Sequence, residues 1–122
     1  MHNVDGGIIE DGFDHYQEGA ATTAIYPEGV CPTCGIDKGI AYTLLGLLGE
    51  AGEFANKYKK VLRDGREFPL GDKQAEVGDM LWYVSELARQ MKTSLGYIAN
   101  MNLDKLLSRK ERGVLGGSGD NR

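Results

Sequence analysis

Residues 45–65 read LGLLGEAGEFANKYKKVLRDG, and residues 76–91 read EVGDMLWYVSELARQM. Apolar residues recur in both stretches at spacings of three and four, the period of one face of an α-helix. Gly65 marks the end of the first helix, because glycine commonly follows a helix in the left-handed conformation. The connection, which contains Pro69, is short, so the two helices are expected to pack as an antiparallel hairpin.

The rest of the chain predicts further helices and no strand, since no segment alternates between apolar and polar residues. The four predicted helices cover about 11–24, 41–63, 72–91 and 94–112. Residues 25–39 hold two prolines, two cysteines and several glycines, and are predicted to be a loop. Residues 113–122 are predicted to be a flexible tail, because the positions from 116 onward carry no apolar side chain. The sequence therefore predicts one all-α domain over 1–122, a four-helix-type bundle built on the hairpin.

The charge of the chain is negative and unevenly placed. Its net charge of −4 argues against binding a nucleic-acid polymer through a basic surface. Residues 1–40 hold seven acids and one lysine, whereas residues 41–122 hold eleven acids and thirteen bases. The second region therefore carries most of the cations that an anionic ligand would need.

The sequence shows no signal for a membrane or for export. No apolar run approaches the roughly 18 residues that span a bilayer. The first residues, MHNVDGG, lack the basic start and apolar stretch of a signal peptide. We therefore expect a cytoplasmic protein with no membrane partner.

Two pairs of acids distinguish the hairpin: Glu50 with Glu53, and Glu76 with Asp79. Each pair is spaced three residues apart, so its members share a helix face, and both pairs lie in or beside the apolar stripe of their helix. One such pair would ordinarily be a solvated surface feature. Two pairs on facing helices bring four carboxylates together at a partly desolvated interface, where they must protonate, pair with cations or bind a metal. Oxygen donors alone suit Mg²⁺ or Mn²⁺ rather than zinc.

The same residues carry a family resemblance. Glu50-x-x-Glu53, a gap of 22 residues and Glu76-x-x-Asp79 resemble the metal-binding signature of the MazG-like all-alpha nucleoside triphosphate pyrophosphohydrolases. The flanking sequences support it: YQEGAATTAIYP (16–27), LGLLGEAGEF (45–54), KYKKVLRDG (57–65), EVGDMLWYV (76–84), NLDKLLSRKERG (102–113) and the final GSGDNR. The similarity covers roughly residues 14–122.

The resemblance implies Mg²⁺-dependent hydrolysis of a ribo- or deoxyribonucleoside triphosphate to the nucleoside monophosphate and pyrophosphate. It places Glu50, Glu53, Glu76 and Asp79 as metal ligands. It also implies that Asn102 and Lys105 help to hold the phosphates and sugar, and that the protein forms a homodimer or homotetramer. The alternative is a non-catalytic helical module that binds metal or nucleotide and regulates a partner.

Several polar residues are candidates for substrate contacts. Basic side chains recur on one face of the last helix and cluster at the end of the second, where they would also favour the helix dipole. The last residues could close over the nucleotide, and Gln17 is a candidate contact to the base. The predicted substrate-binding residues are Lys60, Asn102, Lys105, Arg109, Arg112, Asn121 and Arg122.

One carboxylate would also serve as the general base. Glu53 is our choice, although the sequence does not decide between it and its neighbours. Separately, the hairpin has more apolar surface than one chain easily covers. The candidates for a subunit contact are Leu44, Leu48, Leu81 and Val84.

The motif Cys31-Pro-Thr-Cys34 is not part of the family pattern. It is half of a zinc site, since four ligands are normal and the chain has no other cysteine. His2, His15 or a second subunit could complete it. A reduced loop without metal is the favoured interpretation, and a disulfide is not expected in the cytoplasm.

Overall fold

The computed structural model describes residues 6–122, which contain four α-helices and no strand. The helices are α1 (Gly6–Ala21), α2 (Lys38–Asp64), α3 (Leu70–Gln90) and α4 (Leu95–Glu111). The prediction of an all-α fold is confirmed. His2, named above as a possible zinc ligand, lies outside the described residues. Within residues 6–122, no helix combines the length and apolarity that crossing a membrane requires.

Local capping sets the helix boundaries. The Asp37 side chain accepts a hydrogen bond of 3.0 Å from the Ile40 amide, so α2 begins at Lys38 rather than near residue 41. At the other end Gly65 has φ of 66°, and its amide bonds to the Val61 carbonyl, as predicted for a glycine that ends a helix. The helix predicted from about residue 72 begins earlier: α3 begins directly after Pro69, and Asp72 lies in its first turn.

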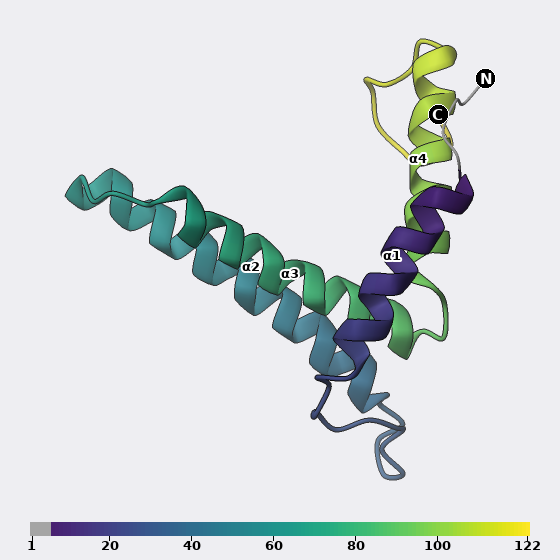
Figure 1. Cartoon of the computed structure of the whole chain (residues 1–122), viewed down its shortest axis with the longest axis horizontal. Coiled ribbons are helices and arrows are strands. Elements are labelled where there is room, and N and C mark those ends of the chain that lie inside the picture. The colour runs from purple at the N-terminus through teal and green to yellow at the C-terminus, as the bar shows by residue number, and fades with distance from the viewer. Residues whose placement is uncertain (1–5) are drawn as a thin grey trace.

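The four helices form two pairs (Figure 1). Helices α2 and α3 make the predicted hairpin, whereas α1 packs against α4. The pairs are joined by contacts of α3 with α1 and α4, and the closed end of the hairpin extends away from the α1–α4 pair (Figure 1). The single chain is therefore not a four-helix bundle around one core.

The pairing of α1 with α4 depends on close contact at Gly96. A Cβ atom at this position would lie 2.6 Å from the backbone of Glu10, so only glycine fits. The Gly96 amide donates to Asp14, and the amide group of Gln17 bonds to both Thr93 and the α4 amide of Leu95. The side chain of Gln17 thus bonds to the start of α4, and its role as a base contact stays a prediction.

A buried acid ties the loop before α2 to α3. Glu86 is fully buried and accepts hydrogen bonds from the Tyr26 hydroxyl and the Arg89 guanidinium, both at 2.7 Å. Burial and the bond to Glu86 raise the pKa of Tyr26 to about 12. Burial alone would raise the pKa of Glu86, but the bonds from Arg89 and Tyr26 outweigh it and lower that pKa below 4.5.

The C-terminal residues fold back on the end of α4, contrary to the flexible tail predicted for 113–122. The Arg122 guanidinium donates to the carbonyls of Val114 and Gly116, at 3.3 and 3.1 Å. Arg112 donates in turn to the Arg122 carbonyl at 3.0 Å. A guanidinium has five donors and can satisfy several loop carbonyls at once, which supplies the order that apolar packing does not.

The chain buries little apolar surface. Among the described residues, the buried apolar side chains are Ala20, Ala88 and Leu95. Exposed large apolar residues include all four candidates for a subunit contact, Leu44, Leu48, Leu81 and Val84. Exposed apolar area on this scale marks an interaction surface.

Candidate metal centre

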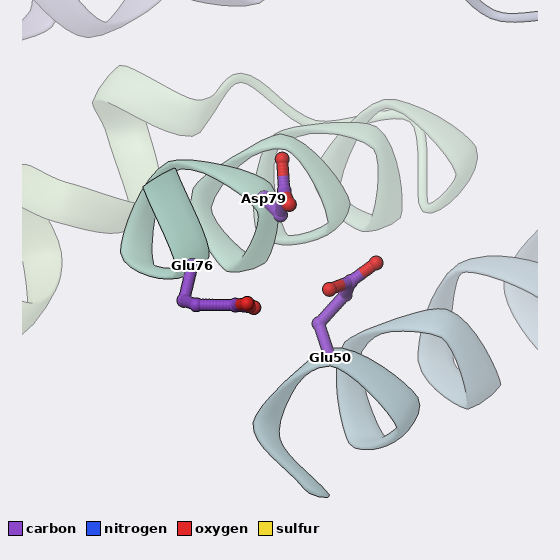
Figure 2. A group of neighbouring side chains, drawn as sticks. All are labelled: Glu50, Glu76 and Asp79. Carbon is purple, nitrogen blue, oxygen red and sulfur yellow. The ribbon is translucent and has the colours of Figure 1, made fainter. Parts of the chain in front are cut away.

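Three of the four predicted metal ligands converge across the hairpin. Glu50 extends from α2 toward the face of α3 that carries Glu76 and Asp79 (Figure 2). Each residue offers a carboxylate oxygen, and the three oxygens lie within 4.8 Å of one another. In the described part of the chain, no other group of three or more His, Cys, Asp or Glu residues is placed to hold a metal ion.

The close approach of the two helices is set by Gly46 and Tyr83. The Tyr83 ring occupies the space in which a Gly46 side chain would lie, since a Cβ there would be 2.1 Å from a ring carbon. Burial raises the pKa of the Tyr83 hydroxyl, and the nearby Tyr42, Glu50 and Asp79 raise it further. The aromatic ring therefore lies on the hairpin interface beside the acids.

Glu76 is the buried member of the cluster, with 6% of its surface exposed. Its Oε1 atom forms an ion pair with Lys57 of α2. Its Oε2 atom is buried and has no hydrogen-bond partner. Leaving a buried charged oxygen without a partner costs folding free energy, so a ligand that bonds to this atom would stabilise the protein.

The electrostatics of the cluster reflect crowding of like charges. Burial raises the pKa of Glu50, and the charges of Asp79, Glu53 and Glu76 add to the effect. The hydrogen bond to Glu76 raises the pKa of Lys57. The cluster is thus an anionic site that one lysine neutralises only in part.

These residues fit a hard divalent cation. All the donors are carboxylate oxygens, the type that Mg²⁺ and Mn²⁺ prefer. Octahedral Mg²⁺ places neighbouring ligands about 3 Å apart and opposite ligands about 4.2 Å apart, so oxygens within 4.8 Å of one another would have to move closer together to bind one ion. The Oε2 atom of Glu76 is a second, independent feature of the cluster, a buried acceptor without a hydrogen-bond partner.

Glu53 does not join the three-carboxylate cluster. Its side chain is 55% exposed and lies 3.5 Å from the ammonium of Lys57, one helical turn away. Lys57 therefore lies between Glu53 and Glu76, with which it forms ion pairs on both sides. Glu53 is at the edge of the cluster and free of the buried contacts that hold Glu76.

A cavity of about 410 Å³ adjoins the cluster toward the closed end of the hairpin. Glu76 belongs to both, so the cavity lies directly beside the acids. Lys60, a predicted substrate contact, lines it together with Arg66. Lys57 and Arg66 belong to the basic cluster predicted at the end of the second helix, although neither was chosen there as a substrate contact. The i, i+4 spacing of Glu53 and Lys57 was the available signal for the first.

The other predicted substrate residues are not near the cluster in one chain. Those on α4 and in the tail are Asn102, Lys105, Arg109, Arg112, Asn121 and Arg122. Arg109 is buried and donates to the Asp120 carbonyl at 2.9 Å, and Lys105 lies 4.0 Å from the Asp120 carboxylate. These residues are distant from the cluster because α4 packs on α1, and its C-terminal end points away from the hairpin (Figure 1).

An apolar groove of about 350 Å³ lies between α1 and α3. Its aromatic lining residues are Phe13 and Tyr16, and α3 contributes Leu81. Burial raises the pKa of Tyr16, with a further contribution from the Asp79 charge, so this groove is close to the acids. Its lining suits a flat apolar group rather than a charged one.

The fold and site define a small all-α protein whose helix hairpin carries a three-carboxylate cluster. The Gene 37 protein of Mycobacterium phage L5 is 50% identical to it over 114 residues, which cover 89% of this chain and 97% of that protein. The chain therefore belongs to the family of the L5 Gene 37 protein. No protein-family model and no solved structure matches the chain.

Proposed function

We propose that the protein is a Mg²⁺-dependent nucleoside triphosphate pyrophosphohydrolase of the MazG-like type. The observation that carries the proposal is the buried, unpartnered oxygen of Glu76 in a carboxylate cluster next to a cavity that three basic side chains help to line. Glu50, Glu76 and Asp79 would hold the ion. When bound, Mg²⁺ would neutralise phosphate charge and favour ionisation of an attacking water.

Glu53 is the proposed general base. It is a carboxylate at the edge of the cluster, exposed to solvent and not one of the three converging ligands. A base must be within reach of the attacking water and retain an oxygen that no metal occupies. Glu53 meets the second condition, and its ion pair with Lys57 keeps the side chain next to the site.

The cavity beside the cluster is the proposed site of the leaving pyrophosphate. Lys57, Lys60 and Arg66 offer three positive charges there, and the lining also holds the acids Glu67, Asp72 and Glu76. Charge accumulates on the pyrophosphate as the bond to the α-phosphorus breaks, so cations at this point stabilise the transition state more than the ground state. The groove of Phe13 and Tyr16 on the other side of the acids would receive the nucleobase.

A second copy of the chain would complete the enzyme. The exposed leucines of α2 and the exposed residues of α3 form an apolar face that a homodimer or homotetramer would cover. The predicted phosphate contacts on α4 lie too far from the cluster of their own chain to serve it (Figure 1). We propose that subunit assembly brings them to the cluster of a partner.

The test is a screen of the common ribo- and deoxyribonucleoside triphosphates for pyrophosphate release with Mg²⁺. The active chain should release pyrophosphate and lose this activity when EDTA is added. Glu50→Gln should remove it, whereas Glu18→Gln, at an exposed position on α1, should not. Binding of metal or nucleotide with no turnover of any triphosphate would instead favour the non-catalytic module.

A further inference from the structure

The segment from Gly29 to Lys38 forms a narrow hairpin-like loop before α2. Val30 and Asp37 make an antiparallel bridge. The Lys38 amide bonds to the Gly29 carbonyl at 2.8 Å, and the Cys31 amide bonds to the Ile36 carbonyl at 2.7 Å. These bonds hold the two sides of the loop together and fix the position of its tip.

The tip is Cys31-Pro-Thr-Cys34-Gly35. The Gly35 amide bonds back to the Cys31 carbonyl at 2.9 Å, and Gly35 has φ of 75°, a conformation that favours glycine. Cys31 is partly exposed and Cys34 is exposed. A hydrogen bond from the Cys34 side chain, together with the amides of Cys34, Thr33 and Gly35, lowers the pKa of the Cys31 thiol. The backbone amides thus surround the sulfur of Cys31, and the sulfur of Cys34 lies beside it.

We propose that this loop is one half of a zinc site, and that two copies of the chain bind one Zn²⁺ through Cys31 and Cys34 of each. Two cysteines separated by two residues have the spacing of zinc-binding loops, and a structural zinc takes four ligands. Within residues 6–122 no His, Asp or Glu joins the two sulfurs in a group of three. The remaining ligands therefore come from a second copy.

The surroundings of the loop suit contact with another copy of the chain. Ile25 is 97% exposed, and Val30 and Ile36, which flank the cysteines, are also exposed. Helix α2 follows at once, and its first turns carry the exposed Leu44 and Leu48. The thiols are thus continuous with the apolar face already proposed for subunit contact. Zinc at this loop would link two chains at the end of the hairpin opposite its closed turn (Figure 1).

The site is distinct from the carboxylate cluster in position and in chemistry. Thiolates select soft or borderline ions such as Zn²⁺, whereas carboxylates select Mg²⁺. Each thiol loses its proton on binding the ion, and no electron is transferred. The inference does not depend on the proposed hydrolase activity.

The experiment uses the full-length chain, purified with a non-thiol reductant and given Zn²⁺ before gel filtration. Metal analysis should find one zinc for every two chains, and Co²⁺ in its place should give the absorption of a tetrahedral four-thiolate site. The Cys31→Ser/Cys34→Ser double variant should lose this metal. Thr33→Ala and Glu50→Gln should keep it, the first because both thiols remain and the second because the carboxylate cluster is separate.

Five results would overturn the proposal. They are no zinc retained, one zinc per chain, a monomeric mass by light scattering in the zinc-loaded state, a disulfide between Cys31 and Cys34 that persists in the reductant, and zinc retained by the double variant, which would place the metal elsewhere. Folding of the double variant is checked by helical circular dichroism.

Discussion

Lys57 donates a hydrogen bond to one carboxylate oxygen of Glu76, while the other oxygen of Glu76 is buried without a partner. The ammonium therefore supplies part of the positive charge that the carboxylates need. Glu50 and Asp79 remain a short distance away, and their mutual repulsion is not relieved by any hydrogen bond to Lys57. The relationship explains how a dense anionic cluster persists on the hairpin and leaves negative charge that the proposed divalent cation would neutralise.

Replacing Lys57 by Met should separate the charge that the lysine supplies to Glu76 from the charge that a bound Mg²⁺ would supply. Without Mg²⁺ the variant should lose about 1–3 kcal/mol of unfolding free energy, because Glu76 is left buried without its cation. With saturating Mg²⁺ the loss should shrink, since the bound ion replaces the missing charge. Urea unfolding in both conditions measures the difference, and Lys59→Met on the same helix is the control. An equal loss with and without Mg²⁺ would show that Glu76 does not share in ion binding.

Asp79→Asn should have opposite effects on stability and on activity. It removes a like charge beside Glu50, so the metal-free protein should become more stable. It also removes a ligand, so Mg²⁺ should bind more weakly and turnover should be lost. The midpoint of urea unfolding in EDTA tests the effect on stability. The Mg²⁺ dependence of pyrophosphate release tests the effect on activity. Near-wild-type turnover in this variant would remove the carboxylate cluster from the mechanism.

Glu53→Gln tests the assignment of the base. Because Glu53 is outside the three-carboxylate cluster, the variant should still bind Mg²⁺. Loss of general base catalysis should lower kcat by about 10²- to 10⁴-fold. Calorimetric Mg²⁺ titration and steady-state kinetics on the same preparation distinguish the roles. If kcat is unchanged, another group takes the proton; if Mg²⁺ binding is lost as well, Glu53 is a ligand.

Gly46→Ala should destabilise the hairpin by about 1–3 kcal/mol, because the new methyl group would collide with the ring of Tyr83. Gly49→Ala is the matched control on the same helix, where no atom lies within 4 Å of the added Cβ. Alanine is the better helix former, so the control should gain up to about 1 kcal/mol. Thermal or urea unfolding of both variants measures the difference in their stability. Equal behaviour of the two would contradict the close packing of Tyr83 on α2.

Glu86 should make the fold sensitive to acid. Its pKa is lowered in the folded protein, so its contribution to stability is complete above the ordinary pKa of 4.5 and is lost as pH falls through the lowered value. The groups that contact it are Tyr26 and Arg89, with Glu28 bonded to the same guanidinium. Glu50, whose pKa is raised, changes stability in the opposite sense, so the comparison of wild type with Glu86→Gln isolates the effect. Urea unfolding from neutral pH down to about pH 3 should show a smaller acid loss in the variant; parallel curves would contradict this prediction.

The sequence predicted the hairpin and three of its converging acids because both follow from local rules. Helical periodicity sets the faces, and i, i+3 spacing puts Glu76 and Asp79 together whatever the rest of the chain does. The end of α2 was predicted in the same way, since Gly65 ends the helix, whereas its start was predicted near residue 41 because the cap by Asp37 was overlooked.

The arrangement of the two helix pairs was not predictable in this way. It depends on contacts between distant residues, such as the approach of Gly96 to Glu10, which no local pattern contains. For the same reason the basic residues of α4 were predicted to contact a substrate at the hairpin, although α4 points away from the hairpin in Figure 1. Glu86 and Arg89 look like an ordinary surface pair at i, i+3 spacing, and only the packing of Tyr26 over α3 shows that the acid is buried.

The most direct test of the central claim is product analysis after hydrolysis in ¹⁸O-labelled water. A deoxynucleoside triphosphate and Mg²⁺ are incubated with the chain, and the products are identified by mass spectrometry. The account predicts a nucleoside monophosphate and pyrophosphate as primary products, with the label in the monophosphate, because water attacks the α-phosphorus. Orthophosphate and a nucleoside diphosphate as primary products would contradict it.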